Sequence, residues 1–385
     1  MNQEYIFRQT KIREQLTLNK VDACLLSTSV NILYANGSIF SGYYYIPAEG
    51  QPQLFVKRPA GLEGENITYI RKPEQIPELL KEKGMALPQG LMLEGDEISY
   101  SDWMRLQACF PKSRLVNGTT DLRRVRSVKT NYEVSLVRAS AEAHVKAYRL
   151  IPKVYRPGMT DSEFSIEIEY IMRREGNQGL FRTFGDMEAF MGSVLTGDNA
   201  AVASPYDFAL GGAGTAFNPI GAAGYLLEPG KSIMIDMCGN FSGYLDDLTR
   251  TFSIGRLTEK AYKAHQVSID IQNRLQEEMK EGTVCEDLYG IALRMAANAG
   301  LADCFMGTTQ QAKFVGHGVG LVINELPVLA MRSKETLKAN MTIAIEPKFV
   351  IEGVGAVGVE DTYLIGKNES ERLTKLDFDI IDLTK

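Results

Sequence analysis

The chain has 385 residues, of which 44% are hydrophobic and 23% are charged, and its formal net charge is −6. This composition is typical of globular domains and excludes disorder, collagen and coiled coil as descriptions of the whole chain. The acidic balance includes no basic block, so we expect no nucleic-acid partner. No apolar run approaches the roughly 20 residues that span a bilayer, so we expect no membrane partner.

The five cysteines are scattered along the chain without a C-x-x-C pair. An odd number of isolated thiols in a large chain is typical of a reduced, cytoplasmic protein. The first residues show no basic start followed by an apolar stretch, so we expect no signal peptide. Both observations favour a cytoplasmic location.

The first part of the sequence alternates helix and strand patterns. Apolar runs at 43–46 and 54–56 flank a polar segment and predict a β-hairpin. The other predicted elements are a helix over 7–19, a strand over 21–26, a helix over 73–84 and a strand over 90–93. This alternation predicts a small α/β domain with a mixed sheet.

The pattern changes near Asp121. The basic stretch at 122–129 is interpreted as a solvated connector, and a long helical pattern follows over 131–154. We place the domain boundary in this stretch. This gives an N-terminal domain over 1–125 and a C-terminal domain over 126–385.

The second domain contains clear helix starts. The segments Thr160-Asp-Ser-Glu163 and Thr283-Val-Cys-Glu286 each fit a capping box, in which threonine and glutamate satisfy free N–H groups at a helix start. They predict helices that end near residues 175 and 298, and a third helix is expected over 260–280. Strands are expected between and after these helices.

Two aspartates lie in a segment that is expected to form a β-hairpin. Asp236 and Asp247 are equidistant from a turn at 241–242. Residues directly opposite in a hairpin have Cβ atoms about 4.5–5.5 Å apart, so the two carboxylates are predicted to face each other. Because successive side chains alternate between faces, Asp246 is predicted to point away from Asp236.

Two glutamates repeat this arrangement later in the chain. Glu346 and Glu360 are equidistant from Gly353, which again lies in an expected turn. Opposed like charges destabilise a sheet, and a carboxylate buried without a partner is costly. Four solvated surface carboxylates are the alternative, but bridging cations better explain the placement of these residues in apolar strands. Hard oxygen ligands favour Mn²⁺, Mg²⁺ or Ca²⁺, and a histidine ligand shifts the choice toward manganese, iron, cobalt or zinc.

One of the three histidines is a candidate ligand. His317 lies between Gly316 and Gly318, in a tight turn located between the two predicted hairpins in the sequence. His144 and His265 are expected on ordinary helical surfaces, and we assign them no role.

The order of these residues resembles the pita-bread metallohydrolases, the family of prolidase, aminopeptidase P, methionine aminopeptidase and creatinase. The resemblance rests on Asp236, Asp247-Leu-Thr-Arg-Thr-Phe, Gly-His317-Gly-Val-Gly, Glu346-Pro and Glu360-Asp-Thr. It implies an α/β (α+β) fold, with a creatinase-like N-terminal α/β domain followed by a C-terminal pita-bread catalytic domain. It also implies a homodimer.

The resemblance further implies a dinuclear centre with two divalent metal ions per chain, manganese first, with cobalt, zinc or iron as alternatives. Asp247 and Glu360 would bridge both ions. Glu346 would also act in catalysis by accepting a proton from the bridging water, and Thr249 would support a metal-bound ligand. The implied metal ligands are Asp236, Asp247, His317, Glu346 and Glu360.

Three positions depart from the peptidase members of this family. Asn324 stands where a second histidine is usual, and Ser204 stands where another histidine is common; both are kept as candidate catalytic residues. Gly358 replaces an arginine that often grips the substrate carboxylate in prolidases. Lys348 is interpreted as a solvated lysine, with compensation for the missing arginine as the alternative.

The expected function is that of a metal-dependent hydrolase that cleaves N-terminal Xaa-Pro bonds of dipeptides or short peptides. The alternative is a creatinase-like hydrolase or lyase acting on a non-peptide small molecule, which the missing histidines favour. The third hypothesis is a non-catalytic, peptidase-like binding module. The complete set of implied ligands argues against it, because a protein without catalysis has no reason to keep paired carboxylates.

Overall fold

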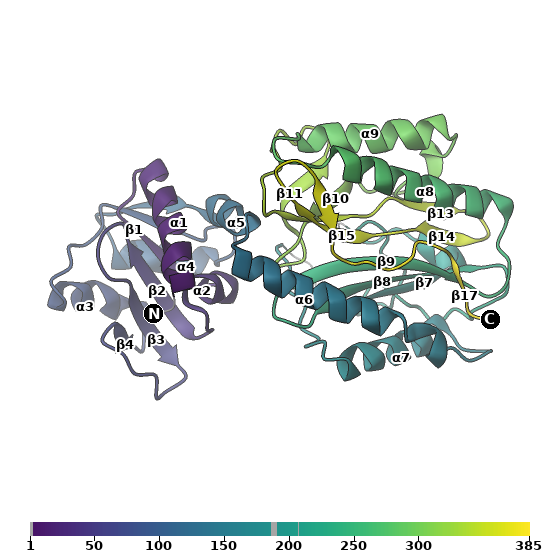
Figure 1. The fold of residues 1–385 in the computed structure, drawn as a ribbon. Helices are drawn as coiled ribbons and strands as arrows, with labels where there is room; N and C mark the ends of the chain where they lie inside the picture. Colours follow the sequence, from purple (N-terminus) through teal and green to yellow (C-terminus); the bar gives the residue numbers. More distant parts are fainter. Residues whose placement is uncertain (1–2, 186–190, 207) are drawn as a thin grey trace. The chain divides into compact units, whose positions relative to one another are not determined.

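The computed structural model describes residues 3–185, 191–206 and 208–385 of the chain (Figure 1). The chain divides into two compact units, of which the first ends at Arg126 and the second begins at Ser127. Both units combine helices with β-sheets, which confirms the predicted α/β class.

The first unit is built on a six-stranded sheet of order β4-β3-β2-β1-β5-β6. Its strands are β1 (Ala23–Leu26), β2 (Ser41–Pro47), β3 (Gln53–Arg58), β4 (Ile67–Tyr69), β5 (Gly90–Leu93) and β6 (Arg114–Asn117). Strand β1 pairs antiparallel with β2 and parallel with β5, so the sheet is mixed, as predicted. The antiparallel pairing of β2 with β3 confirms the predicted hairpin.

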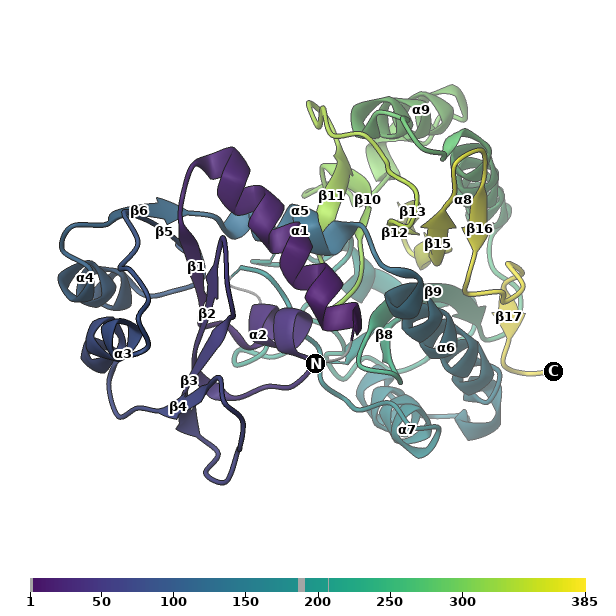
Figure 2. The same cartoon turned by 60° about the vertical axis from the view of Figure 1, so that its left-hand side comes forward.

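Helices cover both faces of this sheet, with α1 and α2 on one face and α3 and α4 on the other (Figure 2). The helices are α1 (Gln3–Asn19), α2 (Ser29–Asn36), α3 (Ile76–Glu82), α4 (Tyr100–Cys109) and α5 (Thr119–Ser127), with a 3-10 turn, η1 (Pro73–Gln75), before α3. Leu80 of α3 and Leu106 of α4 pack against Leu25 and Leu91 of the sheet. The predicted helices over 7–19 and 73–84 are confirmed.

The basic stretch at 122–129 is partly buried, so its interpretation as a solvated connector was wrong. Most of it belongs to α5, and Arg126 is only 3% exposed. The Arg126 guanidinium donates a hydrogen bond to the side chain of Asn31. Lys129 is also buried and donates from Nζ to Ser127 O at 3.1 Å. These acceptors replace water around the buried cations, and charge patterning alone does not reveal them.

The second unit contains a four-stranded sheet of order β17-β9-β8-β7, a five-stranded sheet of order β11-β10-β12-β15-β16, and the separate pair β13-β14. The strands are β7 (Gly192–Thr196), β8 (Ser232–Asn240), β9 (Leu245–Ser253), β10 (Phe314–Gly318), β11 (Glu325–Ala330), β12 (Thr342–Ile345), β13 (Lys348–Ile351), β14 (Gly355–Gly358), β15 (Asp361–Ile365), β16 (Ser370–Arg372) and β17 (Ile381–Asp382). Met234 of β8 packs with Val350 of β13, so the four-stranded sheet contacts the β13-β14 pair through apolar side chains.

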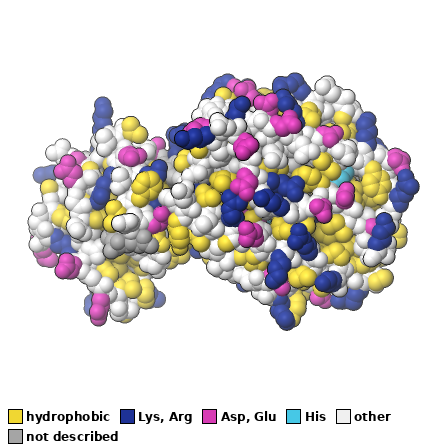
Figure 3. Space-filling view, viewed as in Figure 1, with side chains coloured by type: hydrophobic (Ala, Val, Ile, Leu, Met, Phe, Trp, Pro, Cys, Tyr) yellow, Lys and Arg dark blue, Asp and Glu magenta, His cyan; other side chains and the backbone are white. Residues whose placement is uncertain are grey.

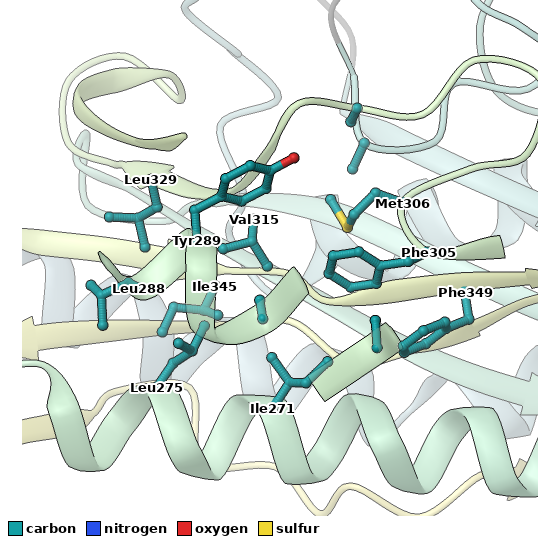
Figure 4. Packing of buried hydrophobic residues seen from close by; sticks show 14 of the residues in the cluster. Ile271, Leu275, Leu288, Tyr289, Phe305, Met306, Val315, Leu329, Ile345 and Phe349 are labelled. Carbon is teal, nitrogen blue, oxygen red and sulfur yellow. The ribbon is translucent and has the colours of Figure 1, made fainter. Parts of the chain in front are cut away.

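Two pairs of helices enclose these strands (Figure 1). Helices α6 (Asn131–Tyr148) and α7 (Asp161–Arg174) lie on the side of β7, β8 and β9, whereas α8 (Glu259–Glu278) and α9 (Cys285–Asn298) lie on the opposite side. Short 3-10 turns are η2 (Ile151–Val154), η3 (Gly197–Ala201) and η4 (Ala302–Cys304). Figure 4 shows Ile271 and Leu275 of α8 packed with Leu288 of α9 and Ile345 of β12. The strands that carry the candidate site are thus held between two apolar layers.

One of the two predicted capping boxes is present. Thr160 caps α7, and Glu163 Oε2 accepts a hydrogen bond from Thr160 N at 2.8 Å, which confirms the first box. The second prediction was wrong, because Val284 is the N-cap of α9 and makes no side-chain cap. The Thr283 hydroxyl instead donates to Glu278 O at 2.8 Å, a contact that ties the end of α8 to the following turn.

Acidic and basic side chains are interspersed on the face of the second unit that Figure 3 shows. The net charge of −6 is therefore not gathered into one acidic patch on that face. Among the residues that the structure describes, none of the helices combines the length and the apolar content needed to cross a membrane.

Candidate metal centre

Strands β8 and β9 bring Asp236 and Asp247 to one face of their sheet. The pairing sets Asp236 opposite Thr249, and Asp247 opposite Cys238. The prediction that the two aspartates are directly opposite was therefore wrong by two residues, because the turn is centred one residue later than expected. A shift of two residues preserves the face, since side chains alternate with a period of two.

Glu346 and Glu360 lie at a break in one long antiparallel ladder. Strand β12 pairs with β15, and β13 pairs with β14. Both pairings have the same register, centred on Gly353, which confirms the predicted turn. This register sets Glu346 against Glu360 where Pro347, which has no N–H to donate, separates β12 from β13. Two carboxylates therefore meet where the ladder is interrupted.

His317 lies on strand β10, opposite Ala344 of β12, so the prediction that it lies in a tight turn was wrong. Its Nε2 is 3.8 Å from Asp247 Oδ2 and 3.5 Å from Glu346 Oε1. Its Nδ1 is 3.0 Å from Gly318 O. An Nδ1–H donated to that carbonyl leaves the Nε2 lone pair directed at the carboxylates, as metal-binding histidines require.

Two groups of three side chains have possible ligand atoms within 4.8 Å of one another. The first group is Asp247, His317 and Glu360, and the second group is Asp236, Glu346 and Glu360. Thr249 Oγ1 donates to Glu360 Oε2 at 2.6 Å. Glu360 Oε1 is buried and has no hydrogen-bond partner among the described residues, so its lone pairs are available to a cation. The fold thus gathers all five side chains that were predicted to bind metal.

Lys348 is completely buried, so its interpretation as a solvated lysine was wrong. Its Nζ lies 2.8 Å from Asp236 Oδ2, 2.7 Å from Glu346 Oε2 and 3.0 Å from Glu360 Oε2. An ammonium group has three N–H donors, and these three contacts use all of them. The alternative role, in which Lys348 replaces the missing arginine as a grip for a substrate carboxylate, has no donor left.

Crowding changes the acidity of the carboxylates. Burial, reinforced by the charges of Glu360 and Asp236, raises the pKa of Asp247 well above its usual value. Burial and the charge of Glu346 raise the pKa of Glu360 to about 8. Such shifts mark positions where the ionised carboxylates are poorly stabilised by water and depend on nearby positive charge.

A buried ion pair that was not predicted from the sequence supports the cluster of side chains at this site. The cluster comprises Asp236, Asp247, Thr249, His317, Glu346, Lys348 and Glu360. Arg250 Nη2 lies 2.9 Å from Asp361 Oδ1, and neither side chain is exposed. Arg250 Nη1 donates to Thr249 O at 2.7 Å and to Glu360 O at 2.8 Å. The guanidinium therefore fixes the backbone of two residues whose side chains meet in the cluster. The position of Arg250, directly after Thr249 in a strand, was a signal that it faces the other side of the sheet.

The prediction that His144 lies on an ordinary helical surface was wrong. His144 is fully buried on α6, and its Nδ1 lies 2.8 Å from Asp246 Oδ2. Asp246 is opposite Gly239, on the sheet face away from Asp236, which confirms its predicted orientation. A side chain at Gly239 would not fit, because its Cβ would lie 2.1 Å from Asp246 Oδ1.

His265 is likewise buried rather than on a helical surface, which corrects the second histidine prediction. Its Nε2 lies 2.6 Å from Phe378 O. Burial lowers the pKa of His265 to about 4, so the ring is neutral at pH 7.

Asn324 and Ser204, the other predicted catalytic residues, are engaged with the backbone. Asn324 Oδ1 accepts a hydrogen bond from Phe184 N, and its Nδ2 donates to Phe184 O, both at 2.8 Å. Ser204 is 8% exposed, and its Oγ accepts a hydrogen bond from Tyr206 N at 3.2 Å. Their catalytic role stays a prediction.

Comparison with known families places the chain in one of them. The model of metallopeptidase family M24 matches residues 135–367, and the model of the creatinase/prolidase N-terminal domain matches residues 8–128. The first match covers more than half of the chain. The chain therefore belongs to metallopeptidase family M24, and it carries the N-terminal domain of creatinases and prolidases.

Individual relatives match along almost the whole chain. The chain is 27% identical over 383 residues to an Xaa-Pro dipeptidase of Pyrococcus horikoshii, covering 96% of this chain and 97% of the relative. It is 26% identical to an Xaa-Pro dipeptidase of Pyrococcus furiosus, covering 97% and 99%. The solved structure of an Xaa-Pro dipeptidase from Bacillus anthracis aligns with a TM-score of 0.81 at 22% identity, covering 98% and 99%. This last likeness shows a shared fold.

The family implies a divalent metal ion, and the two groups of side chains differ in how they fit one. Asp247, His317 and Glu360 offer two carboxylates and an imidazole, a donor set suited to manganese, iron, cobalt or zinc. In the second group, the ammonium of Lys348 already lies among the three carboxylates. The structure therefore fits one ion at the first group and does not fit one at the second.

Proposed function

We propose that this chain hydrolyses the bond after the first residue of Xaa-Pro dipeptides or short Xaa-Pro peptides, with a divalent cation held by Asp247, His317 and Glu360. Membership of family M24 and the similarity to Xaa-Pro dipeptidases over almost the whole chain support this activity. The observation that carries the proposal is the convergence of His317 Nε2, Asp247 Oδ2 and the buried Glu360 Oε1 from three different strand regions.

A divalent ion at this position supplies Lewis acidity to a carbonyl and lowers the pKa of a water molecule. The residues of the chain provide the rest of the chemistry. Glu346 Oε1 lies 3.5 Å from His317 Nε2, beside the proposed cation position, and is placed to accept a proton from an attacking water. Thr249 orients Glu360 through the hydrogen bond to Oε2, which leaves Oε1 for the cation.

Manganese is the ion we propose, because carboxylate oxygens with one imidazole suit it.

The proposal also describes a cytoplasmic homodimer. All five cysteines are free thiols, which agrees with a reducing compartment. The dimer rests on the family resemblance.

The direct test is hydrolysis of a panel of Xaa-Pro dipeptides, longer Xaa-Pro peptides and matched Xaa-Ala peptides with and without added Mn²⁺. We expect Mn²⁺-dependent release of the first residue from Xaa-Pro substrates. Asp247→Asn should lower kcat/KM at least about 100-fold, since even partners of metal ligands cost 10–100-fold when removed. Asp246→Asn is the matched control, because Asp246 points to the opposite face and pairs with His144.

A second candidate function is hydrolysis or C–N cleavage of a small non-peptide compound. One observation favours it: the amide of Asn324, at a position where peptidases of this family usually carry a histidine, is occupied by the backbone of Phe184. Mn²⁺ binding that depends on Asp247, with no cleavage of any peptide in the panel, would contradict the peptidase proposal and favour this candidate.

A further inference from the structure

The ammonium of Lys348 lies at the centre of the second group of carboxylates. Its Nζ is within 2.7–3.0 Å of one oxygen each from Asp236, Glu346 and Glu360. A divalent ion bound to the same three oxygens would lie about 2.0–2.6 Å from each of them. Such an ion would have to take the place of the nitrogen, so the two cations exclude each other.

Charge balance favours the ammonium at this point. Three carboxylates whose oxygens lie within 4.8 Å of one another repel, and all three are at most partly accessible to water. A resident positive charge with three donated hydrogen bonds offsets that repulsion. A divalent ion within this same group of three would instead lie against the ammonium at short range and low exposure, where like charges repel strongly.

The backbone fixes where Lys348 points. Lys348 pairs with Gly358 across the β13-β14 hairpin, and Lys348 O accepts a hydrogen bond from Met306 N at 2.8 Å. A Cβ at Gly358 would lie 2.9 Å from Lys348 Cα and 2.6 Å from Pro347 O. The residue opposite Lys348 must therefore lack a side chain. Lys348 also shares a strand face with Glu346, two residues earlier, which directs its side chain toward the carboxylates.

We propose that the Lys348 ammonium is a built-in replacement for one of the two metal ions, so that each chain binds a single divalent ion at Asp247, His317 and Glu360. This inference deepens the proposed function and rests on it for the nature of the remaining ion. It replaces the expectation of two ions per chain. In this arrangement, Lys348 supplies a fixed charge that holds Asp236, Glu346 and Glu360 together whether or not the single ion is bound.

The test counts Mn²⁺ ions on the full-length protein without any substrate. Metal analysis after desalting and electron paramagnetic resonance should give one Mn²⁺ per wild-type chain, with the six-line signal of an isolated ion. Lys348→Ala opens the second position and should bind two ions per chain, with the multiline signal of a coupled pair. Lys231→Ala is the matched control, because Lys231 Nζ donates to Gly353 O on the same hairpin but lies outside the cluster; it should keep one isolated ion.

Two tightly bound, coupled ions in the wild type would overturn the proposal, as would a wild type that binds none. A folded Lys348→Ala variant that still binds one ion would also overturn it. If Lys348→Ala does not fold, the wild-type count at 100-fold excess of Mn²⁺ decides alone. The proposed function fails separately: a wild type that binds one isolated ion but cleaves no Xaa-Pro peptide supports the single-ion inference and contradicts the peptidase proposal.

Discussion

Arg250 positions two cluster residues from behind the sheet. It is fully buried, donates to the carbonyls of Thr249 and Glu360, and pairs with Asp361 in two contacts of 2.9 and 3.1 Å. The pair is worth little as a net source of stability, because both charges lost their hydration on folding. Its contribution is geometric, since it fixes the backbone that presents Thr249 Oγ1 to Glu360 Oε2.

Removal of this guanidinium should strongly destabilise the protein. In Arg250→Met, Asp361 remains buried with its Thr374 hydrogen bond and the longer ion pair to Arg372 at 3.9 Å, but it loses the guanidinium that donates hydrogen bonds to it. We expect the free energy of unfolding to fall by about 3–5 kcal/mol, as for other broken buried ion pairs. Urea denaturation measures this, with Arg274→Met as the control, because the Arg274–Glu278 pair is exposed and should matter by less than about 1 kcal/mol. Equal losses in the two variants would contradict the assignment.

The spacing of apolar residues along a helix could have predicted that His144 is buried. On α6, Val137, Ala141 and His144 recur at intervals of four and three, and all three are buried. This helical spacing was a usable signal for burial. The partner of His144 was not predictable in the same way, because Asp246 lies about 100 residues away and is brought opposite only by the packing of α6 on β9.

Helix α8 carries a histidine that makes the stability of the fold depend on pH. Burial lowers the pKa of His265 to about 4, whereas an unfolded histidine titrates near 6.5. Between these values the unfolded chain binds the extra proton, so stability falls as pH falls from 6.5 toward 4. We expect this group to reduce the free energy of unfolding by roughly 2 kcal/mol between pH 7 and pH 5.

Denaturation of wild type and His265→Gln at both pH values measures this contribution. Glutamine keeps an N–H donor near Phe378 O but does not titrate. The variant should therefore lose less stability than the wild type on going from pH 7 to pH 5. An identical loss in both proteins would show that His265 does not titrate in this window.

Register explains how much of the candidate site the sequence could predict. The turn at Gly353 was predictable because Glu346 and Glu360 are spaced symmetrically about a glycine. In the structure this glycine has φ +71°, a conformation that favours glycine. The β8-β9 pairing was missed by two residues, since the glycines flanking the turn at 239 and 243 do not determine where pairing resumes. The face of each aspartate was still correct, because the error was an even number of residues.

The contacts of Lys348 could not be predicted from the sequence or from the family resemblance. Its strand face was predictable from its position two residues after Glu346, by the same alternation that placed Thr249 with Asp247. Its contacts were not, because Asp236 belongs to another sheet and approaches only through the packing of β8 against β13 and β14. Lysine is rarely fully buried unless it is paired, so exposure was the expected state and tertiary packing overrode it.

At the scale of the whole molecule, the chain combines a creatinase/prolidase N-terminal domain with an M24 domain. The ammonium of Lys348 lies in the cluster of carboxylates of the M24 domain. The family and the site agree on the use of a divalent metal ion, and we propose one such ion per chain. Shared fold does not fix that number, because a single side chain at position 348 changes the charge of the cluster.

A crystal structure of the Mn²⁺-soaked, full-length protein, with anomalous diffraction at the manganese edge, tests the account most directly. We predict one anomalous peak per chain, bound by Asp247, His317 and Glu360, with Lys348 Nζ still among the oxygens of the second group. Two peaks per chain, or one peak in the place of Lys348 Nζ with the lysine displaced, would contradict the account.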